Sequence, residues 1–251
     1  AIIDSGANII NVSQALLDGG GGGGLTKNGT GTLRLNGINT YTGTTVVNAG
    51  TLGGTGTIAG AVTVGGSATL APGGSIGTLT VNNSVTLGGA TVMEISKDGG
   101  VPASDLLTVS GNLAYSGALT VVLTGTNRLA YNDTFNLFDW GTRSGSFSAI
   151  NLPAGYLWDT SQLSVDGTIR VIGVSPAQIT SSSVSGGNLV LQGAGGPPGA
   201  TYSWLTSTNV AASMSTWTTN TTGVFDGSGG FSNAFPINPS VQKRFFRLKT
   251  P

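Results

Sequence analysis

Short apolar-polar stretches separated by glycine recur through the first half of this chain at a nearly constant interval. Leu33, Leu52, Leu70 and Leu87 follow one another after 19, 18 and 17 residues. Such a spacing is expected if each leucine fills the same slot in successive coils of a stacked repeat. No window here places apolar residues at helical spacing without glycine or several β-branched residues, which argues against an amphipathic helix. The region from Leu25 to Ile95 is therefore predicted to be a parallel β-solenoid, whose stacked coils bury a shared apolar column.

The stretch from Gly31 to Leu52 illustrates one coil. Two alternating strands are predicted, at 32–35 and 44–47, with corners at Asn36-Gly37 and at Tyr41-Thr42-Gly43. Asn-Gly adopts positive φ at little cost, so the chain can turn there. Further inward positions are assigned to aliphatic residues of this and the following coils: Val46, Ile58, Val62, Val64, Ile76, Leu79, Val81, Val85, Val92 and Ile95.

The same stretch resembles the autotransporter-associated β-strand repeat of exported bacterial proteins. The matching residues are Gly31-Thr32-Leu33, Asn36-Gly37, Asn39-Thr40-Tyr41-Thr42-Gly43 and Asn48-Ala49-Gly50-Thr51-Leu52. One departure is the single glycine after Thr42, where the family usually has two. The resemblance implies export, a passenger-type solenoid and an extracellular or cell-surface location. It implies no catalytic residue.

Composition narrows the possible chemistry. The 251 residues contain no Cys and no His, which excludes thiol nucleophiles, Cys/His zinc sites, haem ligation and triads with a His base. Ten basic residues balance ten acidic ones, so we expect neither nucleic acid nor an acidic surface as a partner. No apolar run approaches the roughly 18 residues of a membrane helix, so membrane insertion is not expected. The sequence starts at Ala1 without a leader, which is typical of a mature or trimmed product.

Residues 1–24 form an N-terminal piece of their own, an apolar stretch followed by six glycines from Gly19 to Gly24. Two interpretations stay open. The segment either caps the open end of its own solenoid or donates a strand to a sheet edge of a neighbouring subunit across the glycine hinge. Its apolar residues are dense for a surface tail and are the candidate assembly residues: Ile2, Ile3, Ile9, Ile10, Val12, Leu16 and Leu17.

The solenoid is predicted to extend to residue 174, with broader closing coils and a cap. Beyond Lys97 the strands lengthen and large aromatic side chains appear, which need a wider core than the narrow coils offer. These aromatic residues are Phe135, Phe138, Trp140, Phe147, Tyr156 and Trp158.

Residues 175–251 are predicted to form a small β-sandwich, because short strands alternate there with Gly/Pro turns. The predicted strands are 178–184, 188–192, 201–207, 214–218, 223–226, 230–234 and 242–249. The stretch from Tyr202 to Asn209, together with Phe245-Phe246-Arg247-Leu248, resembles the C-terminal modules of Verrucomicrobia-type repeat proteins. That resemblance implies no activity. The predicted fold class is therefore all-β, a parallel β-solenoid (25–174) followed by a small β-sandwich (175–251).

Candidate catalytic and ligand-binding residues are few. Glu94 and Asp98 come nearest to a carboxylate pair, and an extended strand puts them roughly 13 Å apart. That separation exceeds the about 5 to 9.5 Å of glycosidases, so we expect no catalytic residue, and we expect no metal site and no cofactor. Tyr202, Trp204 and Trp217 are a candidate platform for sugar rings, although aromatic residues in a small sandwich more often form its core.

Three functions remain. The favoured one is a non-enzymatic extracellular structural protein, a rod-like subunit that assembles with itself head to tail into a fibre or layer, since a solenoid has an unpaired edge at each end. The alternative is an adhesin passenger that binds surface glycans or neighbouring cells. An enzyme of the polysaccharide lyase kind ranks last, because Lys27, Arg34 and Glu94 are the only charged residues from Leu25 to Ile95. The cluster Lys243, Arg244, Arg247 and Lys249 is expected to solvate and protect a sheet edge.

Overall fold

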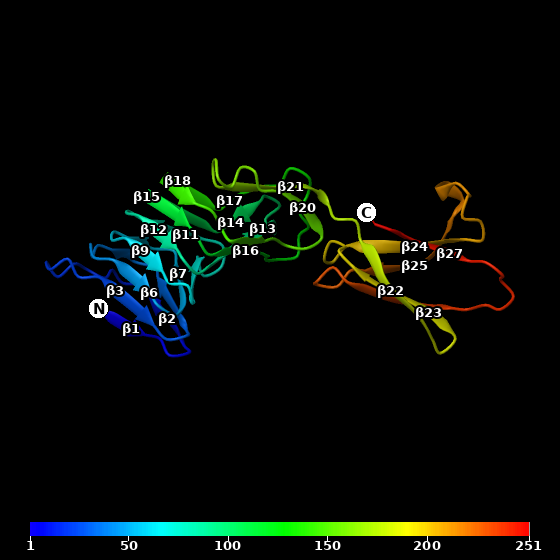
Figure 1. The fold of residues 1–251 in the computed structure, drawn as a ribbon, viewed down its shortest axis with the longest axis horizontal. Coiled ribbons are helices and arrows are strands. Elements are labelled where there is room, and N and C mark those ends of the chain that lie inside the picture. Colours follow the sequence, from blue (N-terminus) through cyan, green and yellow to red (C-terminus); the bar gives the residue numbers. More distant parts are fainter. Residues whose placement is uncertain (251) are drawn as a thin grey trace. The chain divides into compact units, whose positions relative to one another are not determined.

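The computed structural model describes residues 1–250, and nearly all of their regular elements are β-strands (Figure 1). Within that range the helical structure is limited to one 3₁₀ turn, η1 (Met214–Thr216). No helix in the described part of the chain has the length and apolar character needed to cross a membrane. The chain folds into two compact units. The first comprises residues 1–127, 133–153 and 159–170, and the second comprises residues 128–132, 154–158 and the chain from 171 onward.

The first unit contains a ten-stranded parallel sheet with the order β1-β3-β6-β9-β12-β15-β11-β8-β5 and with β18 beside β15. The order reverses at β15, because the first half of this long strand pairs with β11 and its second half pairs with β12. The sheet therefore supplies two faces of each coil. Its strands are β1 (Ile2–Asp4), β3 (Leu25–Asn28), β5 (Ile38–Asn39), β6 (Thr45–Val47), β8 (Thr57–Ile58), β9 (Val62–Val64), β11 (Thr78–Val81), β12 (Val85–Leu87), β15 (Leu106–Tyr115) and β18 (Phe138–Gly145).

An eight-stranded sheet supplies the third face, with the order β19-β16-β13-β10-β7-β4-β2 and with β14 beside β13. All of its pairings are parallel except that of β13 with β14. Successive coils follow one another from blue to green in Figure 1. The strands are β2 (Ile9–Val12), β4 (Thr32–Leu35), β7 (Gly50–Gly54), β10 (Ala68–Pro72), β13 (Ala90–Ser96), β14 (Ala103–Ser104), β16 (Ala118–Leu123) and β19 (Ala149–Asn151).

The strand register aligns the side chains of successive coils into columns. Leu33, Leu52 and Leu70 are fully buried and directly opposite one another, which confirms the predicted stacking of these three leucines. Because each coil covers the next, the apolar surface of every leucine is removed from water on both sides, at about 25 cal/mol per Å². We call this set the leucine column. Its members in register are Ile10, Leu33, Leu52, Leu70, Thr91, Leu119 and Ile150.

The placement of Leu87 in the leucine column is wrong. The residue opposite Leu70 is Thr91, 21 positions further on, whereas Leu52 and Leu70 are 18 apart. The corner after β10 adds five residues to the offset, since Thr57 pairs with Thr80, and the corner after β12 removes two. Leu87 lies in the other large sheet, opposite Val64 and Tyr115. The near-equal spacing of this fourth leucine is a coincidence of loop lengths.

Three other inward assignments are wrong as well. Val46, Ile76 and Val92 are half-buried, whereas Val47 and Met93 are fully buried. Val46 and Val92 lie in strands, where side chains alternate between the faces, so an error of one position exchanges inside for outside. Ile76 lies in the loop between β10 and β11. The remaining predicted inward residues are buried: Ile58, Val62, Val64, Leu79, Val81, Val85 and Ile95.

The closing coils contain an aromatic cluster. Tyr115 stacks on Phe147 with ring centroids 4.3 Å apart, and it meets Phe138 edge-on at 5.3 Å. Phe135 and Phe138 are fully buried. A three-stranded sheet of order β17-β21-β20 follows, formed by β17 (Thr134–Asn136), β20 (Tyr156–Asp159) and β21 (Thr168–Val174).

Two three-stranded antiparallel sheets, β22-β23-β26 and β25-β24-β27, make up the C-terminal module. Leu191 of one sheet and Tyr202 and Trp204 of the other share one core. The predicted all-β fold, a parallel solenoid followed by a small sandwich, is confirmed. The strands are β22 (Gln178–Ser185), β23 (Asn188–Ala194), β24 (Thr201–Ser207), β25 (Thr218–Val224), β26 (Phe231–Pro236) and β27 (Phe245–Lys249).

The strand predicted at 214–218 is wrong. Residues Met214–Thr216 form the 3₁₀ turn η1, and β25 begins only at Thr218. The Thr216 backbone N–H and its hydroxyl both donate to the carbonyl oxygen of Ser213, at 2.9 and 2.7 Å. Such local bonds of Ser and Thr compete with strand pairing and favour a turn.

Candidate functional site

Residues 1–18 form the first coil of the solenoid. β1 pairs in parallel with β3, so that Ile3 lies opposite Lys27, and β2 pairs in parallel with β4, so that Ile10 lies opposite Leu33. The third side is closed by Leu16, whose N–H donates to the side-chain oxygen of Asn39 at 3.0 Å. The N-terminal segment therefore pairs within its own chain, as the capping interpretation expects.

The outer edges of β1 and β2 carry no partner strand among residues 1–250, because these strands are the first members of the two large sheets. At the other end of the stack, β18 pairs only with β15 and β19 only with β16 in the same range. The unpaired N–H and C=O groups of such an edge are a template for a further strand. The two edges have different sequences, so a contact between them is heterologous rather than self-complementary.

The candidate assembly residues all lie on this first coil, in two exposure classes. Ile2, Ile9 and Leu17 are 74%, 60% and 72% exposed. The others are half-buried and begin the inward columns or lie at the third side: Ile3, Ile10, Val12 and Leu16. Large apolar side chains are usually buried, so this coil end presents apolar surface that the described chain does not cover.

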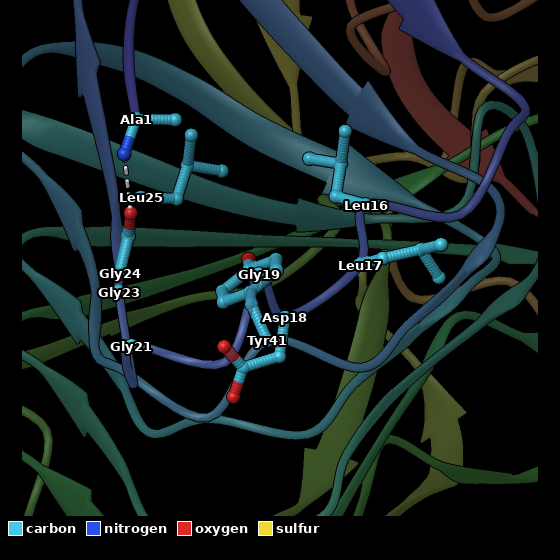
Figure 2. Close-up of a pocket in the computed structure, with 10 residues that line it drawn as sticks. All are labelled: Ala1, Leu16, Leu17, Asp18, Gly19, Gly21, Gly23, Gly24, Leu25 and Tyr41. Atoms are coloured by element: carbon cyan, nitrogen blue, oxygen red, sulfur yellow. Dashed lines mark hydrogen bonds between the residues drawn. The ribbon is translucent and has the colours of Figure 1, made fainter.

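A cavity of about 450 Å³ opens beside the first coil. Figure 2 shows Leu16 and Leu17 on one side of it and Leu25 with the glycine run on the other. The glycine run is a loop held by Asp18, whose carboxylate accepts the Gly20 N–H and the Thr42 hydroxyl, each at 3.0 Å. The cavity is therefore lined by apolar side chains and bare backbone, with one carboxylate at its edge.

A buried lysine lies directly beneath the first coil and was not singled out from the sequence. Lys27 is fully buried, and its ammonium donates to the carbonyl oxygens of Asn28, Gly29 and Ala49 at 2.7, 2.8 and 3.1 Å. Burial lowers the pKa of Lys27, and the Asp4 carboxylate opposes that shift. Its place two residues after the inward Leu25 was the available sequence signal.

The carboxylates near Glu94 and Asp98 differ in their surroundings. Asp98 is exposed and accepts the N–H groups of Thr126 and Asn127, which hold its pKa below the usual range. Asp105 is fully buried, and its carboxylate accepts the N–H of Gly77 at 2.9 Å and that of Glu94 at 2.7 Å.

Burial raises the pKa of Asp105 to about 7, against the lowering effect of its two backbone hydrogen bonds, and the charge of Glu94 adds to the rise. Asp105, Glu94 and Arg34 line a cavity of about 110 Å³. Within residues 1–250, no three His, Cys, Asp or Glu side chains are grouped so that they could hold a metal ion. Glu94 and Asp105 are eleven positions apart in the sequence, and no sequence signal indicated that they lie close together.

The candidate sugar platform is divided between the core and the surface of the module. Tyr202 and Trp204 are buried, and both donate to the side-chain oxygen of Asn233, at 2.6 and 2.8 Å. Trp217 is half-buried and donates to the carbonyl of Ala212 at 3.1 Å. Two of the three rings are thus core residues, and the three do not present a common exposed face.

Comparison with known families gives one match. Residues 25–53 match the model of the Passenger-associated-transport-repeat family, and they span the coil of β3, β4 and β5 and the beginning of the next coil, with β6 and most of β7. No curated protein matches the chain. The repeat implies a secreted or surface-exposed autotransporter passenger, and both it and the solenoid are consistent with a non-enzymatic role. Residues 25–53 thus match a passenger-associated transport repeat, and they lie within a parallel β-solenoid.

Proposed function

We propose that this chain is a non-enzymatic structural subunit that assembles with itself head to tail outside the cell. The observation that carries the proposal is that β1 and β2, the edge strands of the two large sheets at the first coil, each have one side without a partner strand in the described chain. A neighbouring subunit that added its β18 and β19 there would extend both sheets with the parallel pairing that already joins successive coils. Contacts of this heterologous kind form filaments when they do not close into a ring.

The leucine column supports this end-to-end arrangement. It begins at Ile10, which is half-buried, and it ends at Ile150, which is 41% exposed. Stacking one subunit on the next would bring these two isoleucines together and continue the column. Both would gain the burial that Leu33, Leu52 and Leu70 already have.

The test is a pair of single substitutions at the two column ends. Ile10→Lys and Ile150→Lys should each leave a folded protein, because the lysine reaches water at an open end of the isolated chain. Each should abolish filaments seen by negative-stain microscopy, because in the assembly the charge would be buried without a partner. Thr63→Lys is the control, since Thr63 is exposed in the middle of the solenoid.

Mixing the two variants sharpens the test. Each retains one unmodified end, so an equimolar mixture should give dimers and no longer species by light scattering. Filaments that form undiminished in both variants would exclude the column ends as the contact. A wild-type chain that stays monomeric at all concentrations would contradict self-assembly and favour the adhesin function.

A further inference from the structure

The charges of this chain are segregated along its length, although their sum is zero. Residues 1–170 contain six basic and nine acidic side chains, whereas residues 171–251 contain four basic side chains and one acidic side chain, Asp226. Potentials at a surface follow the local distribution of charge rather than the total. The C-terminal module is therefore a basic body in a protein with few charges.

All four basic residues of the module lie at or just before its last strand, β27. They are Lys243, Arg244, Arg247 and Lys249, and all four are exposed. Within residues 1–250 none of them forms an ion pair; the described pairs are Lys97 with Asp133 and Arg170 with Asp159. These cations are thus available to an external anion.

The backbone places two of these cations on one face. Phe246 and Leu248 pack against the core of the module, so the alternate residues Arg247 and Lys249 project from the opposite face of β27. Two residues of extended chain separate them by roughly 7 Å. The pair forms a short row of positive charge along the edge of the sheet.

Hydroxyl groups accompany this row across the same sheet. Lys249 lies opposite Ser203, which lies opposite Thr222 on the far strand, roughly 10 Å away over two strand spacings. Thr219 and Thr222 of β25 are exposed and share this face, because Thr219 lies opposite Leu205, which lies opposite Arg247. The face therefore combines cations at one edge with neutral hydrogen-bonding groups at the other.

We infer that the outer face of β27, β24 and β25 binds an acidic polysaccharide, with Arg247 and Lys249 on its carboxylates and the Ser/Thr hydroxyls on its sugar hydroxyls. Arginine suits this role because its planar guanidinium pairs with a carboxylate through two hydrogen bonds. This site is distinct from the strands of the proposed assembly edges, which are β1 and β2 at the first coil and β18 and β19 at the last.

The same face is poorly suited to single-stranded nucleic acid. Recognition of unpaired bases relies on exposed aromatic rings on which the bases stack. Tyr202 and Trp204 of the central strand β24 are instead turned into the core. The chemistry that remains is charge plus hydroxyl, which matches a uronate polymer.

The test measures binding of the full chain to polygalacturonate and to its methyl-esterified form, which has the same backbone without the charges. We expect binding to polygalacturonate in low salt, loss of binding at 1 M salt, where screening acts over roughly 3 Å, and no binding to the ester. Arg247→Glu should weaken binding at least about tenfold, because it replaces attraction by repulsion. Arg128→Glu is the matched control, since Arg128 is exposed and lies outside the module's basic cluster.

Several results would overturn the inference. Equal affinity of Arg247→Glu and the wild-type chain would show that the basic row does not contact the ligand. Equal binding of the ester would remove the role of charge. Tighter binding to DNA or to phosphatidylserine vesicles than to polygalacturonate would assign the face to another class of partner. If the wild-type chain bound no polysaccharide and Arg247→Glu aggregated, the inference would be wrong. The basic residues would then only protect the edge of the sheet against pairing with other chains.

Discussion

The solenoid and the C-terminal module bury their apolar side chains in different ways. In the narrow coils, Leu33, Leu52 and Leu70 each lie opposite one residue of the preceding coil and one residue of the following coil. In the module, aromatic rings contact one another in a single cluster, with centroids 4.7 to 5.9 Å apart. The first kind of core is open-ended and can be extended by further coils, whereas the second is closed.

This difference predicts how damage should spread. In a stack, a defect weakens the contacts of one coil with its two neighbours, because the stability is a sum over neighbouring units. In the closed cluster, the loss of one ring removes contacts from several others at once. The following substitutions test this contrast, beginning with the largest expected effect.

Leu52→Asp should unfold the central coils. The change buries an unpaired charge at a fully buried position of the leucine column, and we expect a loss of more than about 4 kcal/mol. Thermal melting followed by circular dichroism measures it. Thr63→Asp is the control, because Thr63 is exposed, and it should change stability by no more than about 0.5 kcal/mol. Equal melting curves for both variants would contradict the register described above.

Trp204→Ala should destabilise the module by about 3 to 5 kcal/mol while leaving the solenoid folded. The substitution empties the position of a fully buried ring and removes one of the two donors to Asn233. Limited proteolysis should then degrade the module and spare a solenoid fragment. Trp217→Ala, at a half-buried ring, should have a smaller effect. Simultaneous loss of both parts would mean that the two cores are coupled.

Asp105 should make the solenoid less stable as the pH rises from about 4 to 7. Burial raises the pKa of Asp105 to about 7, so the folded chain holds this proton more tightly than the unfolded chain does. The resulting stability is fully present below the unfolded pKa and is lost as the pH passes through the folded pKa. A shift of about three pKa units corresponds to an upper limit of about 4 kcal/mol.

The check is urea unfolding of Asp105→Asn at several pH values, which should show a flatter dependence in this window. Asp98→Asn serves as the control, because the pKa of Asp98 is shifted below its usual range. An Asp105→Asn profile as steep as that of the wild-type chain would assign the dependence to other groups.

Thr91→Val should stabilise the solenoid by about 1 kcal/mol. The Thr91 hydroxyl is buried in the leucine column without a hydrogen-bond partner among residues 1–250, so an apolar group of the same shape removes a desolvation cost. Thr45→Val is the matched comparison, because the equally buried Thr45 hydroxyl bonds to Tyr41 at 2.6 Å. That change should destabilise by a similar amount. Denaturant midpoints that move the same way in both variants would contradict the assignment.

The solenoid was predictable because its signals are local. Asn36-Gly37 marks a corner, and the alternation from Thr32 to Leu35 marks a strand, without reference to any other coil. The position of Thr91 depends instead on the length of a loop relative to the loop of the preceding coil. That comparison can be made only when the strand boundaries of both coils are known.

The candidate site was predictable only in part. Ile2, Ile9 and Leu17 belong to an N-terminal segment that is unusually apolar for a surface tail, and this pattern predicted a candidate contact surface there. Its pairing with β3 and β4 is a long-range choice, because the same strand pattern fits the chain's own edge and a neighbour's edge equally well. The environment of Asp105 arises where β14 pairs with β13 in an antiparallel direction. The regular spacing of the coils does not predict this pairing.

A stack of near-identical coils is exposed to misalignment during folding, and its buried polar residues counter it. Lys27 and Asn39 each occupy one level of a column that is otherwise apolar at the next coils, where Val47 and Ile58 stand in register. If a folding chain docked one coil too far, the Lys27 ammonium would keep its bonds to Asn28 and Gly29 but lose the one to Ala49 of the next coil, which weakens the support of a buried charge. These two side chains thus distinguish their own coil from the apolar coils that follow, and they favour the correct alignment of the stack.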